Sequence, residues 1–536
     1  MKKFIYTFSF ILLFASCKQE QVDLIVTNAN IYTVDTAFSN AEAFAIKDGK
    51  FVAVGTTAEI TNKYAATTTF DAQGQTIVPG LIDAHCHFYR MGLQQQKVSL
   101  EGTKSYDEVL EKLVAFQKEK NVSFITGRGW DQNDWDIKEF PTKEKLDKLF
   151  PETPVAVRRV DGHAMLVNQA AIDLAGITKN TKVSGGEIIV KDGKMTGVLI
   201  DAAMKFIQIP IPTKKESIQG LLDAQEIAFS YGLTTVDDAG LDQNTIELID
   251  SLQQTNKLKM RIYAMVSATQ KNLDYYINKG IIKTDRLNVR SFKVYGDGAL
   301  GSRGAAMRKS YSDRENHFGA LIYSPDRYRE IAKQIAASEY QMNTHAIGDS
   351  ANAWILKIYK KELKDAKNRR WRNEHSQIVS LEDFKLFKNV VPSIQPTHAT
   401  SDMYWAGDRI GKERMKGAYA FKDLLNVYGK VALGTDFPVE KVSPFLTFYA
   451  SAIRKDLDGY PEGGFQMENA LTREETLKGM TIWAAYSNFE ENEKGSIEIG
   501  KFADFTILNQ DIMQVDGAKI PATKATATYL NGEKVY

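Results

Sequence analysis

The stretch that decides the fold is Val78-Pro-Gly-Leu-Ile-Asp-Ala-His85-Cys-His87-Phe88, an apolar run that ends in two histidines one residue apart. In a β-strand, side chains two residues apart point to the same face, so His85 and His87 project together while Cys86 points away. Two imidazoles at the end of a buried strand are suitable ligands for a divalent transition metal. The pair alone is also compatible with two histidines that bind no ion, so the rest of the chain decides.

Around this stretch, eight short apolar runs predict buried parallel strands, and most of them are followed by a helical pattern. Eight βα units indicate an α/β fold, a TIM-type (β/α)8 barrel over residues 77–484, with its chemistry at the C-terminal ends of the strands. The predicted strands are residues 77–84, 234–238, 260–266, 292–295, 342–345, 371–375, 393–395 and 431–436.

Two further units accompany the barrel. Residues 22–76 and 485–536 both carry short alternating segments broken by turn signals, and neither end is long enough for a domain alone. We expect one small β-sandwich built from both termini. A long stretch, about 88–222, follows the first barrel strand and contains its own helical pattern and an Asp192-Gly193 hairpin signal. It predicts an inserted α+β subdomain that forms part of the pocket.

The N-terminus has the pattern of an export signal. Lys2 and Lys3 precede an apolar segment, residues 4–14, that is too short to span a bilayer, and small residues lead to Cys17. The segment resembles a bacterial lipoprotein signal peptide over residues 1–17, with Cys17 as the lipidated residue. The prediction is an exported lipoprotein anchored to a membrane of the bacterial envelope. The alternative is an ordinary secretory signal cut near Ser16.

Composition limits the partners. Basic and acidic residues number 68 and 67, and no polybasic run is present, which argues against a nucleic-acid partner. The only two cysteines are Cys17 and Cys86, so lipidation of Cys17 would leave no disulfide. We expect a small-molecule substrate, contact with the membrane only through the lipid anchor, and leave homo-oligomerisation open.

More candidate ligands fall at the ends of the later predicted strands. His345 and His375 end the fifth and sixth runs, and Asp436 ends the eighth. Lys293 lies inside the fourth run, where a buried ammonium is costly because burial disfavours the charged form. This lysine therefore requires a chemical reason for its position.

These motifs together resemble the amidohydrolase superfamily, in the branch that includes the N-substituted formamide deformylases and related metal-dependent hydrolases. The resemblance extends from about residue 22 to the C-terminus. It is carried by Pro79-Gly-Leu-Ile-Asp-Ala-His85-Cys-His87, Gly129-Trp-Asp-Gln132, Asp161-Gly-His163, Lys293 with Asp297-Gly-Ala-Leu-Gly-Ser-Arg303, His345-Ala-Ile-Gly-Asp349, Glu374-His375, Gly434-Thr-Asp436 and Lys494-Gly-Ser-Ile-Glu-Ile-Gly-Lys-Phe-Ala-Asp504.

The resemblance implies a centre with one or two divalent metal ions, Zn²⁺ being the expected metal. His85 and His87 then correspond to ligands of the more buried ion, and His345 and His375 to ligands of the more exposed one. Two catalytic ligands complete the set: Asp436, which contacts metal and moves protons, and Lys293, which CO₂ can convert into a bridging carbamate.

Six further residues are weighed as pocket residues. His163 is expected to contact the substrate or its oxyanion, the alternative being a hydrogen-bonded loop histidine. For the polar-aromatic segment of the insert, a substrate wall and a packed turn are both compatible with the sequence. Arg303 suits a substrate carboxylate. The predicted substrate-binding residues are Trp130, Asp131, Asp297, Arg303 and His398.

The predicted activity is hydrolysis of a carbon–nitrogen bond, in an N-substituted amide or formamide-like small molecule, by metal-activated hydroxide. One alternative is a hydrolase of lactones or cyclic amides, or a deaminase, on the same scaffold. Another is a binding lipoprotein that has lost the chemistry. The identity of the substrate, the native metal and the resident membrane are not encoded in these motifs.

Overall fold

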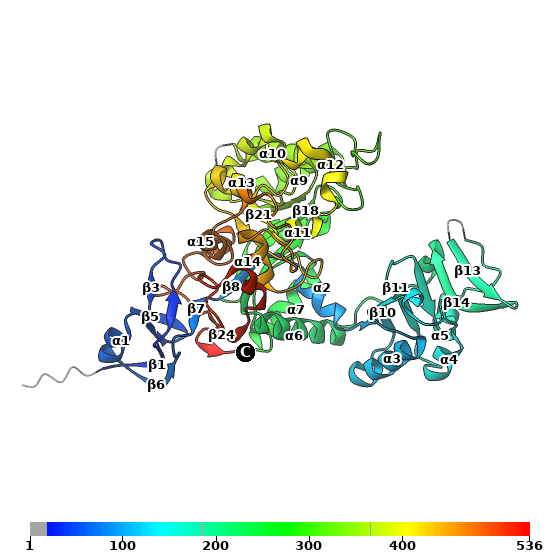
Figure 1. Cartoon of the computed structure of the whole chain (residues 1–536), viewed down its shortest axis with the longest axis horizontal. Coiled ribbons are helices and arrows are strands. Elements are labelled where there is room, and N and C mark those ends of the chain that lie inside the picture. Colours follow the sequence, from blue (N-terminus) through cyan, green and yellow to red (C-terminus); the bar gives the residue numbers. More distant parts are fainter. Residues whose placement is uncertain (1–18, 184–185, 365) are drawn as a thin grey trace, which may run out of the picture.

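The computed structural model describes residues 19–183, 186–364 and 366–536, so the predicted signal segment and Cys17 lie outside the described residues. Figure 1 shows a central barrel with a strand-rich unit on one side and the insert set apart on the other. No helix in the described part of the chain combines the length and apolar character that crossing a membrane requires.

Eight parallel strands form the nearly closed barrel, which confirms the predicted fold class. The gap between the last and first strands is bridged by backbone hydrogen bonds between the C-terminal end of β8 and the segment that follows β22. Asp436 N–H donates to His85 O (2.8 Å), and His87 N–H donates to Phe437 O (2.8 Å). In sheet order, the strands are β8 (Leu81–Cys86), β15 (Leu233–Leu241), β16 (Arg261–Ser267), β18 (Leu287–Tyr295), β19 (Gln341–Ala346), β20 (Arg372–His375), β21 (Val391–Ile394) and β22 (Ala432–Leu433).

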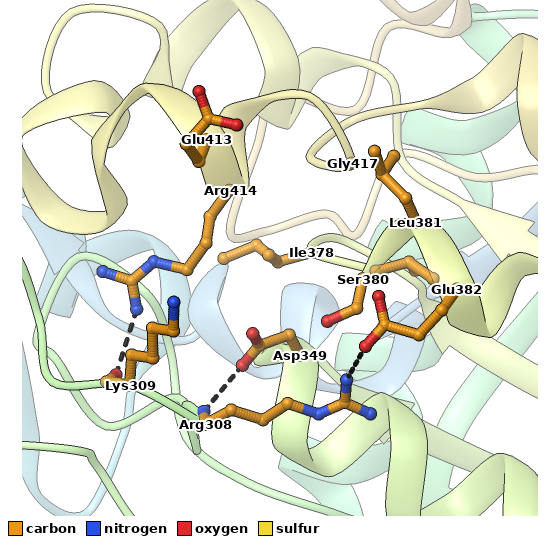
Figure 2. Close-up of a pocket in the computed structure, with 11 residues that line it drawn as sticks. Arg308, Lys309, Asp349, Ile378, Ser380, Leu381, Glu382, Glu413, Arg414 and Gly417 are labelled. Carbon is orange, nitrogen blue, oxygen red and sulfur yellow. Dashed lines mark hydrogen bonds and ion pairs between the residues drawn. The ribbon is translucent and has the colours of Figure 1, made fainter.

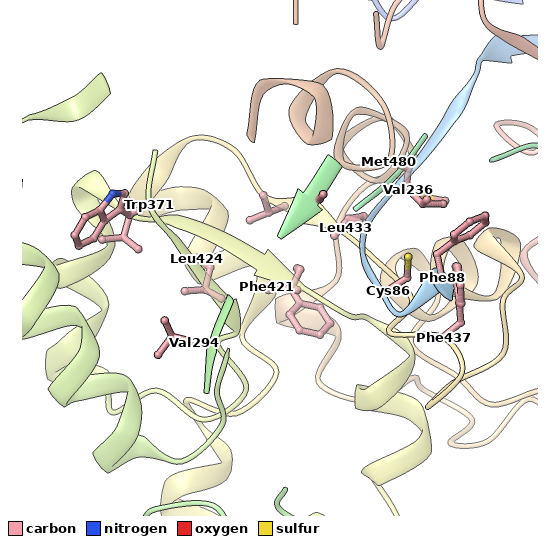
Figure 3. Close-up of a cluster of buried hydrophobic side chains, with 14 of the residues drawn as sticks. Cys86, Phe88, Val236, Val294, Trp371, Phe421, Leu424, Leu433, Phe437 and Met480 are labelled. Carbon is pink, nitrogen blue, oxygen red and sulfur yellow. The ribbon is translucent and has the colours of Figure 1, made fainter. Parts of the chain in front are cut away.

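Helices cover the outside of the barrel and bury one apolar face each. Figure 3 shows Cys86, Phe88 and Phe437 grouped beside the first strand, where β8 meets the segment after β22. The principal helices are α2 (Phe88–Gln94), α6 (Lys214–Ser230), α7 (Gln243–Gln254), α8 (Gln270–Lys279), α9 (Pro325–Ala336), α10 (Asp349–Leu363), α11 (Thr397–Asp402), α12 (Ala406–Met415), α13 (Phe421–Tyr428), α14 (Pro444–Ala452), α15 (Arg473–Gly479) and α16 (Ile482–Ser487).

Two sheets built from both ends of the chain lie beside the barrel, with Phe44, Phe51 and Phe505 packed edge to face or tilted between them. The first predicted barrel strand is divided at Gly80, because β7 joins the second of these sheets and only β8 joins the barrel. The sheets contain β5 (Lys50–Gly55), β4 (Ala43–Lys47), β1 (Glu20–Thr27) and β6 (Tyr64–Asp71), and β25 (Glu533–Lys534), β24 (Ala525–Leu530), β23 (Phe505–Leu508), β7 (Thr76–Pro79), β2 (Asn30–Tyr32) and β3 (Asn40–Ala41).

The insert has its own six-stranded sheet and its own apolar clusters. Helices α2 and α6 join it to the barrel, and they approach so closely that a Cβ on Gly92 would lie 2.0 Å from Gly220 O. Figure 1 places the insert beyond these helices, beside the barrel and not over it. Its elements are β9 (Val98–Ser99), β10 (Ile125–Trp130), β11 (Val155–Arg159), β12 (Ala164–Val167), β13 (Gly186–Lys191) and β14 (Lys194–Asp201), with α3 (Tyr106–Lys120), α4 (Glu144–Leu149) and α5 (Gln169–Ala175).

Candidate metal centre

Four histidines from three barrel strands and the start of α2 meet at the C-terminal end of the barrel. The ring centroid of His375 lies 4.8 Å from that of His85 and 4.5 Å from that of His345. The His85 and His87 rings are 5.9 Å apart and nearly perpendicular. Because parallel strands present their C-terminal ends at one mouth, histidines far apart in the chain gather there.

Hydrogen bonds fix which nitrogen His85 and His87 present to the cluster. His85 Nδ1 contacts the carboxylate of Glu374, and His87 Nδ1 lies 2.9 Å from Ala239 O. With these acceptors, both rings carry the proton on Nδ1 and keep Nε2 for another partner. His85 Nε2 lies 3.0 Å from Lys293 Nζ, and His87 Nε2 lies 3.3 Å from Asp436 Oδ1. A held Nδ1 with a free Nε2 is the usual state of a metal-ligating histidine.

Lys293 lies at the centre of this arrangement and is almost completely buried. Burial lowers its pKa to about 8, although the carboxylates of Glu374 and Asp436 act in the opposite direction. A large fraction of the amine is therefore neutral near pH 8, whereas an exposed lysine is almost entirely protonated there.

Asp436 and His375 hold backbone conformations that few non-glycine residues adopt, with φ of 64° and 71°. Such conformations persist where the surrounding structure determines them, and they concentrate at functional sites. Burial alone would raise the pKa of Asp436, but the hydrogen bond from His398 and the nearby His87 ring hold it well below the usual value. Asp436 is thus an anion that faces the histidines.

His398 joins the cluster from the other side of Asp436. Its Nε2 lies 3.2 Å from Asp436 Oδ2, and its Nδ1 lies 3.2 Å from Glu440 Oε1. Burial lowers the pKa of His398, but the hydrogen bonds to these two carboxylates outweigh it and raise the pKa to about 10. The sequence identified His398, but it did not identify Glu440, which follows the strand end in a loop without a motif.

The side chains present fit a divalent metal. Three buried ligand atoms have no hydrogen-bond partner among the described residues: His345 Nε2, His375 Nδ1 and Asp436 Oδ1. Leaving buried polar atoms unpaired costs free energy, and a bound cation would satisfy them. Two groups place ligand atoms within 4.8 Å of one another, His85 with His87 and Asp436, and His375 with His398 and Asp436.

A buried ionic network of Arg372, Glu374 and Asp237 lies inside the barrel next to the histidines. Arg372 Nε donates to Glu374 Oε1 (2.7 Å) and Arg372 Nη1 to Asp237 Oδ2 (2.7 Å), and all three side chains are fully buried. Burial would raise the pKa of Glu374, but Arg372 and His85 lower it well below the usual value. Arg372 was not predicted from the sequence, because β20 is the polar segment Arg-Asn-Glu-His and an arginine in it carries no signal of a buried charge.

The structure departs from the predictions at three residues of the insert. The Trp130 indole is buried in the insert's own core and donates to Val157 O (2.9 Å), so it cannot form a substrate wall. Asp131 pairs with Arg159 and caps the short helix that follows β10. His163 is 74% exposed and pairs with Asp201 within the insert, which Figure 1 shows set apart from the barrel.

The side chains of Asp297 and Arg303, both in loops, also form hydrogen bonds with other parts of the protein. The carboxylate of Asp297 accepts hydrogen bonds from the backbone N–H groups of Ala306, Ile347 and Gly348, so it orders the loops at the mouth. The Arg303 guanidinium donates two hydrogen bonds to Asp313, at 3.0 and 2.8 Å. Both side chains are therefore held by partners within the loops, so their positions do not require the substrate contacts that the sequence predicted.

Comparison with known proteins identifies the class of this centre. A sequence profile described as the Amidohydrolase family matches residues 68–536. The chain belongs to the amidohydrolase family. This amidohydrolase is 30% identical to the protein LONG AFTER FAR-RED 3 of Arabidopsis thaliana over 540 residues, 96% of this chain and 91% of that protein. It is 24% identical to an N-substituted formamide deformylase of Arthrobacter pascens, over 95% of this chain and 97% of that protein.

A solved structure gives the same result for the fold and the chemistry. The amidohydrolase superposes on an uncharacterized metal-dependent hydrolase from Pyrococcus horikoshii with a TM-score of 0.77 and 25% sequence identity. The match covers 92% of this chain and 99% of that one. The amidohydrolase is therefore a metal-dependent hydrolase, as its sequence predicted, and the candidate ligands lie at the mouth of its barrel.

A polar cavity of about 280 Å³ lies away from this centre (Figure 2). Its charged groups already have partners: the Arg308 guanidinium donates to Glu382 (2.6 Å), Asp349 accepts from the backbone N–H of Arg308 (2.9 Å), and Arg414 donates to the backbone carbonyl of Lys309 (3.0 Å). Among the described residues, no member of the histidine cluster lines this cavity or forms a hydrogen bond with its wall.

Proposed function

We propose that the amidohydrolase hydrolyses a carbon–nitrogen bond in an N-substituted amide or formamide-like small molecule. The observation that carries the proposal is the set of unpaired, buried ligand atoms around the anionic Asp436. The similarity to an N-substituted formamide deformylase supports the choice of bond, because that relative spans nearly the whole chain.

The ligand set we propose is His85, His87, His345, His375 and Asp436, with Lys293 as a sixth member. One or two Zn²⁺ ions bound there would polarise the substrate carbonyl and lower the pKa of a water molecule. The chain's own residues then have separate tasks. Glu374 holds His85, and the Ala239 carbonyl holds His87, in the ligating tautomer.

Proton transfer is the task of Asp436. Its side chain is a carboxylate, and the unpaired Oδ1 can accept a proton from the attacking water. It can then give that proton to the departing nitrogen, which an amide requires because an amine anion is a very poor leaving group. His398, held by Glu440, orients the other oxygen of the same carboxylate.

For Lys293 we propose conversion to a carbamate. The neutral amine adds to CO₂, a nitrogen–carbon bond forms, and one proton leaves, so a buried cation becomes an anionic oxygen ligand. The lowered pKa of Lys293 supports the proposal, because only the neutral amine reacts.

The test compares three variants, His85→Ala, His345→Ala and Asp436→Asn, on a panel of N-formyl and N-acyl amides with added Zn²⁺. We expect kcat/KM to fall by about 100-fold or more in each, because each removes a ligand or the proton carrier. His317→Ala is the matched control, since His317 bonds to the Arg303 carbonyl outside the cluster. Turnover that is unchanged in all three variants would refute the assignment.

We also propose that the enzyme is exported and held at a membrane of the bacterial envelope through a lipid on Cys17. The proposal rests on the charged, apolar and small-residue pattern of residues 1–17. Metabolic labelling with a palmitate analogue should mark the wild-type chain, and Cys17→Ala should lose the label and leave the membrane fraction. A labelled Cys17→Ala chain would contradict it.

A further inference from the structure

A second cavity, of about 250 Å³, borders the proposed catalytic centre. It lies between α11, which carries His398, and α14 with the segment that follows it. Glu440 forms part of its wall, and the same carboxylate lies 3.2 Å from His398 Nδ1. Since His398 Nε2 lies 3.2 Å from Asp436 Oδ2, one imidazole ring separates this cavity from the proton-carrying carboxylate.

The wall of this cavity is mainly apolar. Leu446, Tyr449 and Ala450 come from α14, and Leu457 and Tyr404 come from the loops at its opening. Lys441 and Lys455 also border it, and a lysine contributes an aliphatic stem as well as its ammonium group. Such a lining favours a hydrocarbon group, because apolar surface gains free energy on leaving water.

The carboxylates in the wall already have partners. Glu440 accepts hydrogen bonds from Ser401 Oγ (2.6 Å) and from His398. Asp456 accepts from the Tyr404 hydroxyl and from the backbone N–H groups of Asp458 (2.9 Å) and Tyr460 (2.8 Å). These oxygens therefore help to build the wall and are not aimed at a cationic ligand.

The size of the cavity selects one part of a substrate. Pockets that enclose a whole drug-sized ligand measure roughly 300–1,000 Å³. A cavity of about 250 Å³, whose wall includes the carboxylate that holds His398, is suited to a single substituent. We propose that it receives the uncharged apolar substituent on the substrate nitrogen, so that the natural substrates are N-alkyl or N-cycloalkyl amides. This inference rests on the proposed function and deepens it.

The test uses N-methyl-, N-hexyl- and N-cyclohexylformamide with the metal-loaded enzyme. Leu446→Trp fills the cavity, and the ratio of kcat/KM for N-hexyl- over N-methylformamide should fall by about tenfold or more, the usual effect of changing an apolar pocket. Leu457→Ala opens the exposed rim with little risk to folding, and it should lower the same ratio. Leu381→Ala is the matched control, because Leu381 is 59% exposed, as against 60% for Leu457, and lines the separate cavity of Figure 2.

The outcomes separate the inference from the function on which it rests. No turnover of any amide by the wild-type enzyme would overturn the proposed function. Turnover with an unchanged hexyl-to-methyl ratio in both Leu446→Trp and Leu457→Ala would overturn only the substituent pocket. Wild-type preference for 6-formamidohexanoate over N-hexylformamide would overturn the assignment of an uncharged substituent. A lowered ratio in both variants, with an unchanged ratio in Leu381→Ala, supports it.

Discussion

Replacement of Glu374 by glutamine should weaken metal binding without removing a ligand. Glu374 receives the Nδ1–H of His85 on one oxygen and the Arg372 Nε–H on the other (2.7 Å). A glutamine of the same shape offers only one acceptor, and its amide N–H₂ must face one of these two donors. His85 then loses the acceptor that fixes its tautomer and orientation.

The magnitude follows from comparable outer-sphere changes, which cost about 10–100-fold in metal affinity, or about 1.4–2.7 kcal/mol. The assay is competition for Zn²⁺ between the apo-enzyme and a chelating indicator. Glu490→Gln is the matched control, because Glu490 is equally buried and pairs with Lys494 (2.6 Å) and Lys283 (3.1 Å) outside the cluster. Wild-type zinc affinity in Glu374→Gln, or an equal loss in Glu490→Gln, would refute the reasoning.

Three further predictions follow from the same geometry. Arg372→Met leaves Asp237 and Glu374 as buried carboxylates without their cation. The free energy of unfolding, measured with denaturant, should therefore fall by about 3–5 kcal/mol. An unchanged denaturant midpoint of unfolding would contradict this prediction. CO₂-depleted enzyme should recover its activity faster as pH rises, at fixed dissolved CO₂, with a midpoint near pH 8. The reason is that burial lowers the pKa of Lys293 to about 8 and only the neutral amine reacts with CO₂. A midpoint near the usual lysine pKa would contradict this prediction. His163→Ala should leave kcat/KM unchanged, because His163 lies exposed in the insert; a large loss would restore its predicted contact with the substrate.

Much of the barrel could be predicted from the chain because its signals are local. Most of the parallel strands contain a short apolar run, and residues such as His345 and Asp436 mark the strand ends by their chemistry. The exception is the first run, which is divided at Gly80. A run of apolar residues does not show that its first half pairs with β23 of a different sheet.

Contacts between distant loops could not be predicted in the same way. Trp130 and Asp131 have residue types that suit a substrate wall, but whether they reach the pocket depends on where α2 and α6 direct the insert. Arg303 has its carboxylate partner ten residues away in an irregular loop. Glu440 becomes interpretable only when His398 is seen between it and Asp436.

The most direct test of the central claim is a crystal structure of the zinc-loaded enzyme, with anomalous diffraction recorded at the zinc edge. The peak should lie at about 2.0–2.2 Å from the Nε2 atoms of His85 and His87 and within coordinating distance of Asp436. A fully loaded, active enzyme without anomalous density between these three side chains would contradict the assigned centre.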